Sequence, residues 1–257
     1  MRAQKIILFL VICSSWIPLV HGTEVFLPGD ELTLPPLLYE VLRSGKEEGR
    51  LNLTAPDQHS YEAAKGEWLD YGDSFNIPNG LAFQIIQKET LQWVGGGQFS
   101  GKIGMGSLVK DDRVYDLTLT HGWIKVWIKP DSNHSSLMIH THGGDFLAKN
   151  GIFWMNTRLE RTEVYLVQGE LITQPGGIPL TNRGYALYEK GKDKPLYIAK
   201  DWDPQAIEVR IAASYPQFIQ LAGTAQQEWE DGKISRTYAI YRKKGWRKAS
   251  RLEPNSK

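Results

Sequence analysis

The residues of this sequence with the clearest binding chemistry lie in one short segment, residues 123–129. Its side chains alternate in character, which is typical of a β-strand, where residues two apart share a face. One face carries Ile124, Val126 and Ile128 and is expected to lie in the core. The opposite face presents the polar and aromatic residues Trp123, Lys125, Trp127 and Lys129.

The two indoles of this second face are expected to lie about 13 Å apart, since they are four residues apart at ~3.3 Å per residue. That spacing suits the stacking of two sugar rings, with the lysines reaching carboxylate or phosphate groups. We therefore take Trp123, Lys125, Trp127 and Lys129 as candidate ligand-binding residues. In the alternative interpretation, the C-terminal helices or a loop cover this face and make the tryptophans ordinary core, because exposed apolar patches are uncommon.

A pair of histidines, His140 and His142, lies close to Asp145 in the sequence. On a strand both imidazoles would share a face, and His121 is the available third ligand for a metal ion. No spacing rule brings His121 to the pair. We therefore expect edge or turn histidines, and no bound metal.

Catalytic residues are not indicated by the remaining polar motifs. Paired carboxylates for glycoside cleavage must face each other about 5–10 Å apart across a cleft, and the linear sequence does not show this for its candidate acids, Asp70, Asp73, Glu160 and Glu163. Asp70 and Asp73 lie in a turn-like segment that suits backbone hydrogen bonding. Residues 95–97 are three glycines without the Lys-Ser/Thr of a phosphate loop, which predicts a sharp turn or bulge. We expect no enzyme activity and no cofactor, and a glycan-acting enzyme is the distant alternative.

Short alternating runs dominate the chain between about residues 39 and 198, separated by Gly, Pro, Asn and Asp. These runs predict strands at residues 81–86, 114–120, 123–129, 136–141, 151–156, 163–168 and 195–199. No helical period separates them, so a parallel sheet with helical crossovers is excluded. The pattern predicts a mainly β fold, an antiparallel β sandwich or roll.

A short helical appendage is predicted after residue 200. Asp203-Pro204 is a favourable helix start, and apolar residues then recur mostly every three or four positions. These apolar residues are Ile207, Ile211, Phe218, Ala222, Ala225 and Trp229. Pro216 interrupts the run, which predicts two helices, or one kinked helix, between about residues 204 and 230.

The first 22 residues have the composition of a secretory signal peptide. Arg2 and Lys5 precede an apolar run at residues 6–12, and residues 20–22 resemble a cleavage site. Lipidation at Cys13 is the alternative. Cleavage after Gly22 would leave a chain without cysteine or a membrane-spanning segment, exported to the periplasm or the cell surface.

The end of the chain is basic and the rest is acidic. From Lys233 onward there are nine Lys or Arg against one acid, Glu253. Such an arm suits polyanion contact, for which the candidates are Arg242, Lys243, Lys244, Arg247 and Lys248. The alternative is that the arm folds against the acidic body of its own chain.

Four segments in a fixed order, residues 67–75, 117–126, 136–141 and 163–171, resemble the FecR-like domain of bacterial periplasmic proteins. The order comprises a Gly-Asp turn before a strand, a hairpin segment with Leu, Gly, Ile and Val at family spacing, and a closing Val-rich strand. The resemblance implies an all-β, non-enzymatic domain outside the inner membrane. Its relatives include transmembrane regulators that relay iron-siderophore signals to a sigma factor. This chain differs from them in its cleavable signal, and His142 replaces a frequent proline.

Three parts are expected on this basis: a signal peptide at 1–22, a FecR-like all-β domain at 23–200, and a helical segment with a basic tail at 201–257. The expected function is that of a non-catalytic binding or scaffold protein of the cell envelope. Its expected partner is peptidoglycan or another glycan, or an envelope protein, and not nucleic acid. A periplasmic signalling component is the alternative.

Overall fold

A computed structural model shows how these segments are arranged. It describes residues 24–25, 37–43, 51–63, 67–87, 90–104, 106–109, 112–130, 135–174, 177, 179–192, 194–233 and 247–248. The predicted signal peptide at 1–22 lies outside these residues, as do Arg242, Lys243 and Lys244 of the predicted basic arm.

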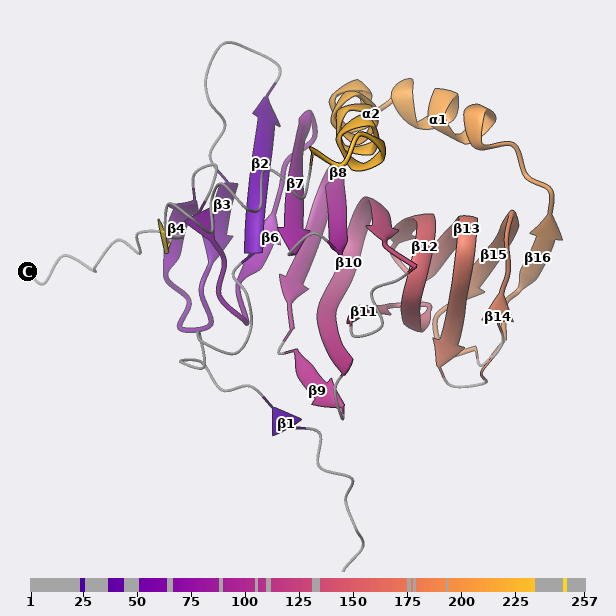
Figure 1. Ribbon diagram of the computed structural model, residues 1–257, viewed down its shortest axis with the longest axis horizontal. Coiled ribbons are helices and arrows are strands. Elements are labelled where there is room, and N and C mark those ends of the chain that lie inside the picture. Colours follow the sequence, from indigo (N-terminus) through magenta and orange to yellow (C-terminus); the bar gives the residue numbers. More distant parts are fainter. Residues whose placement is uncertain are drawn as a thin grey trace, which may run out of the picture.

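Most of the described chain forms β-strands (Figure 1). They are β1 (Glu24–Val25), β2 (Leu37–Arg43), β3 (Leu51–Thr54), β4 (Ser60–Ala63), β5 (Glu67–Trp68), β6 (Ser74–Asn76), β7 (Leu81–Gln87), β8 (Leu91–Ile103), β9 (Ser107–Val109), β10 (Asp112–Ile128), β11 (Ser135–Thr141), β12 (Gly144–Arg158), β13 (Arg161–Gln174), β14 (Pro179–Leu180), β15 (Gly184–Glu189), β16 (Tyr197–Lys200) and β17 (Arg247–Lys248).

Within the described residues, fifteen strands join in one large open sheet with the path β16-β15-β13-β12-β11-β10-β8-β6-β3-β4. β7 pairs with β8 and β2, β9 pairs with β10 and β1, and β14 pairs with β13. The pairs are antiparallel except β10 with β11, where Arg113 aligns with Ser135 and Thr118 with His140. The prediction of a mainly β fold is confirmed, and its strands form a single mixed sheet.

The predicted strands at 114–120 and 123–129 are two halves of one long strand, β10. The register between β10 and β8 shifts on either side of His121, as expected at β-bulges. On β8 the irregularity falls at residues 97–99, where Gly97 has a φ of +71°. Gly95 and Gly96 pair with β10 in regular register. The bulge predicted at residues 95–97 is therefore found at Gly97 and the two residues after it.

Each face of the sheet has its own core. On one face a large apolar cluster includes Ile124, Val126 and Ile128, as predicted from their alternation. On the other face Trp123 and Trp127 belong to a second cluster, together with buried residues of the C-terminal helices. We call this second cluster the helix-side core.

Two helices, α1 (Pro204–Ala212) and α2 (Pro216–Glu230), pack against this second face. In Figure 1 they lie along the upper ends of the strands. The Asp203 side chain caps α1 by accepting a hydrogen bond from the Gln205 N–H at 2.9 Å. Each helix begins with a proline, which tolerates the first helical position because no N–H is needed there. The predicted pair of helices is confirmed. The apolar residues predicted to face the sheet are buried or partly buried against it.

A short strand lies near the C-terminal end of the described residues. β17, which contains Arg247 and Lys248 of the predicted basic arm, pairs in parallel with β5. No helix among the described residues is long and apolar enough to span a membrane.

Candidate functional site

The candidate ligand-binding face of Trp123, Lys125, Trp127 and Lys129 is not an open surface. The exposed fraction is 3 % for Trp123, 0 % for Trp127 and 3 % for Lys125, because α1 and α2 lie on this side of the sheet. The prediction that the indoles form an accessible stacking platform is therefore wrong for this conformation. The alternative, that the C-terminal helices cover the face, describes what is found.

Lys125 joins the sheet to both helices. Its Nζ donates to Oε1 of Glu208 on α1 at 3.2 Å and to Oε1 of Gln226 on α2 at 2.7 Å. The same ammonium lies 4.2 Å from the Trp154 ring centroid and 5.2 Å from that of Trp127, within the range of cation–π attraction. Burial lowers the pKa of Lys125, and the Glu208 carboxylate opposes that shift. This lysine has a structural role.

Lys129 lies at the rim of the same face and is only partly buried. Its ammonium lies 5.7 Å from the ring centroid of Trp229, near the end of α2. The four residues of the candidate platform thus share one role, which is to hold the helices on the sheet.

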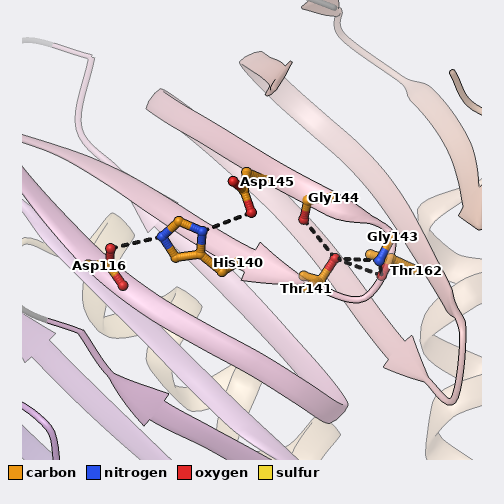
Figure 2. A network of polar contacts seen from close by, with 7 residues as sticks. All are labelled: Asp116, His140, Thr141, Gly143, Gly144, Asp145 and Thr162. Carbon is orange, nitrogen blue, oxygen red and sulfur yellow. Dashed lines mark hydrogen bonds and ion pairs between the residues drawn. The ribbon is translucent and has the colours of Figure 1, made fainter. Parts of the chain in front are cut away.

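The two histidines of the pair have different surroundings. Figure 2 shows His140 between two carboxylates, with Nε2 at 2.9 Å from Asp116 and Nδ1 at 2.8 Å from Asp145. The hydrogen bond with Asp116 is the main reason that the pKa of His140 is raised to about 9. Its imidazole is therefore protonated at neutral pH and links β10, β11 and β12. His142 is exposed, and no cluster of three His, Cys, Asp or Glu in the described part of the chain could hold a metal ion.

The hairpin next to His140 is held by hydroxyl groups (Figure 2). Thr141 Oγ1 donates to the Gly144 carbonyl at 2.9 Å and accepts a hydrogen bond from Thr162 at 2.9 Å. The Gly143 N–H donates to Thr141 Oγ1 at 3.1 Å. These contacts tie the β11–β12 turn to β13 and leave no free nucleophile in this network.

The Asp70–Asp73 segment is a turn, as predicted. The Asp73 carboxylate is fully buried and accepts hydrogen bonds from the Tyr61 hydroxyl and, at 2.7 Å, from the Asp70 N–H. A carboxylate engaged in this way organises the turn and does not face a cleft.

The best candidate site is a hollow of about 280 Å³ where the end of α1 meets the sheet. Its lining comes from five elements and consists of Trp123, Asn156, Arg158, Glu163, Arg210, Ile211, Ser214 and Tyr215. We call it the Arg158–Arg210 hollow. Ile211 is 1 % exposed and anchors the end of α1, so Arg210 beside it is held at the rim.

The two arginines are held differently. Nη2 of Arg210 donates to the Tyr165 hydroxyl at 2.7 Å and lies 3.7 Å from a Glu163 carboxylate oxygen. Its guanidinium also lies 5.9 Å from the Trp123 ring centroid. Arg158 donates to the Tyr215 hydroxyl at 3.1 Å. Arg210 is therefore fixed by several partners, whereas Arg158 is held at the protein surface by one hydroxyl.

A buried amide adds to this arrangement. Nδ2 of Asn156 donates to Glu163 at 3.1 Å, whereas its Oδ1 is buried without a hydrogen-bond partner among the described residues. Burial lowers the pKa of the nearby His121, and the positive charge of Arg158 adds to that effect. The hollow thus carries two permanent positive charges and one carboxylate, an arrangement that favours an anionic ligand.

The glycine bulge makes room for this hollow. A Cβ at Gly97 would lie 3.2 Å from the rings of both Trp123 and Tyr215, and its positive φ disfavours other residues. A side chain here would push the α1–α2 turn away from the sheet.

Among the polar and aromatic residues that line the hollow, the sequence singled out Trp123 as a candidate binding residue and Glu163 as a candidate acid, and it did not indicate the two arginines. Arg158 and Tyr215 are 57 positions apart, and no motif joins them. Glu163 lies in a predicted strand and Arg210 in a predicted helix, but only the packing of α1 on β13 brings them together.

Comparison with known proteins gives little guidance. No protein-family model matches the chain, and no curated protein matches it. Among solved structures, two crystal structures of candidate anti-sigma factors from Parabacteroides distasonis are similar to it, with TM-scores of 0.34 and 0.32. Their identities are 11 % and 12 %, over 55 % and 66 % of this chain. The matches span 62 % and 64 % of those chains, less than two thirds of their length. Neither match carries an argument about function here.

Proposed function

We propose that this protein is an exported, non-catalytic binding protein of the bacterial envelope, with a FecR-like β domain that binds an anionic polymer. One observation carries the proposal: two guanidinium groups, those of Arg158 and Arg210, line the same hollow. Guanidinium groups bind carboxylates and phosphates through paired, charge-assisted hydrogen bonds. Both anions occur in envelope polymers.

The different ways in which the two arginine side chains are held support a binding role. Arg210 is already oriented by Tyr165 and Glu163, so little side-chain freedom is lost when it meets a ligand. The guanidinium of Arg158 is held by one hydroxyl, that of Tyr215, and can exchange this neutral partner for an anion. Trp123, which is almost wholly buried, contributes an apolar edge to the lining of the hollow.

The test is co-sedimentation of the purified protein with isolated cell-wall sacculi over a range of salt concentrations. We expect saturable binding that weakens as salt rises, because exposed charges are screened. Arg158→Gln and Arg210→Gln should each weaken binding about tenfold or more, in line with the ~1.5–3 kcal/mol of a hydrogen bond to a charged group. Arg183→Gln is the matched control, since Arg183 is exposed and lies outside the hollow.

Sacculi stripped of phosphate polymers separate the two anion sources. Retained binding assigns the ligand to carboxylates, and lost binding assigns it to phosphates. Binding that survives both arginine changes would contradict the proposed site. No binding at any salt concentration would contradict the proposed function.

A further inference from the structure

β16 ends the sheet on the side of α1, at the right in Figure 1. It pairs with β15 from Gly184↔Lys200 to Leu187↔Tyr197, and no described strand pairs with its other edge. Along such an edge, backbone N–H and C=O groups point away from the sheet and can accept an additional strand.

The side chains at this edge are unusually apolar. Leu196, Tyr197 and Ile198 are consecutive and are 59 %, 56 % and 49 % exposed. Single exposed apolar residues are common on protein surfaces. A continuous run on an open strand edge instead marks an interaction surface or an aggregation hazard.

On both faces of the sheet, the layer of packed apolar side chains ends at β16. On the helix side, a row of rings crosses the sheet from Trp123 through Tyr165 and Tyr185 to Tyr197, with successive centroids 6.2, 4.6 and 5.9 Å apart. On the opposite face, Ile198 lies directly beside Ala186, which is fully buried in the large core. An added strand with apolar side chains on both faces would extend both layers.

The positive charge of the lysines around this edge restricts the charge that a partner segment can carry. Four exposed lysines flank it, and none forms an ion pair with a described residue: Lys190, Lys192, Lys194 and Lys200. Lysines on an edge oppose pairing between two copies of the same strand, because like charges meet across the new ladder. The same charges attract an acidic segment.

We propose that β16 is a docking edge for an extended acidic segment of a partner protein, which adds to the sheet as a further strand. The backbone ladder supplies affinity, Tyr197 and Ile198 receive apolar side chains on the two faces, and the lysines select acidic flanks. This interaction is independent of the Arg158–Arg210 hollow.

The probe is a fluorescein-labelled peptide, Glu-Glu-Val-Tyr-Val-Tyr-Val-Glu-Glu, with a second peptide that has lysine for glutamate. We expect saturable binding of the acidic peptide by fluorescence anisotropy, and slower amide hydrogen exchange at residues 197–200. A combined Tyr197→Ser and Ile198→Ser variant should bind about tenfold more weakly or worse. A combined Lys194→Glu and Lys200→Glu variant should prefer the basic peptide.

Val209→Ser is the control, because Val209 is 71 % exposed on α1, away from the edge. Unchanged binding in this variant and in Arg158→Gln supports the assignment to β16. Equal affinity for both peptides, no saturable binding, or no slowing of exchange at 197–200 overturns the proposal. Dimerisation in sedimentation velocity that Ile198→Ser abolishes would assign the edge to a second copy and also overturn it.

Discussion

Removing Glu208 should destabilise the protein through the buried ammonium of Lys125. Lys125 is 3 % exposed, and its Nζ lies 3.2 Å from Glu208 Oε1. At an effective dielectric constant of about 20, the attraction between the two charges is about 5 kcal/mol before desolvation is counted. Water screens part of it, because Glu208 is 40 % exposed. Gln226 and the two indoles also continue to hold the ammonium in Glu208→Ala. We therefore expect this change to lower the free energy of unfolding by about 2 kcal/mol.

Replacing the lysine should be less damaging than removing its partner. Lys125→Met keeps the volume of the side chain and removes the buried charge, and the remaining Glu208 carboxylate can turn to water. We expect a change within about 1 kcal/mol. In the Lys125→Met background, Glu208→Ala should then have almost no effect, which gives a coupling energy of about 1.5–2 kcal/mol.

Urea unfolding followed by tryptophan fluorescence measures the unchanged protein and the three variants of this cycle, and Val209→Ala on the same helix controls for helix propensity. The pH dependence is a second check. Because the folded-state pKa of Lys125 is lowered, the charged amine destabilises the fold at neutral pH, and the deficit of Glu208→Ala should shrink as pH rises toward 10. Additive effects of the two changes, or a cost below about 0.5 kcal/mol for Glu208→Ala, would refute this account of the buried charge.

Three further outcomes are expected. The folded-state pKa of His140 is raised to about 9, so its stabilising contribution is complete below about pH 6.5 and is lost as pH rises through 9. Since the ring is 37 % exposed, screening reduces this contribution to about 1 kcal/mol, and His140→Gln should remove that part of the pH dependence measured by urea unfolding. Phe218→Ala should lower the free energy of unfolding by about 3–5 kcal/mol, because the ring is buried against Trp154; a loss below 1 kcal/mol would show that α2 is not firmly packed. Asp203→Ala should reduce stability by about 1 kcal/mol through the lost helix cap, and an unchanged melting temperature would contradict that role.

The strands and helices were largely predictable because their signals are local. Alternation along residues 123–129 depends only on neighbours, and it correctly assigned Ile124, Val126 and Ile128 to a core. The Asp203-Pro204 start and the three- and four-residue steps after it depend on one helix at a time. The continuity of β10 through a double bulge, and its parallel pairing with β11, have no comparable local signal.

The sequence by itself therefore determined a mainly β chain, two C-terminal helices, and the two faces of the strand at 123–129. It did not determine what lies against the second face, because Trp and Lys are amphipathic and suit both a binding surface and a covered one. Only the tertiary structure decided this, by bringing Gln226 to Lys125 across 101 positions. The Arg158–Arg210 hollow arises in the same way, since its charges come from two strands and a helix that meet only when the helices pack on the sheet.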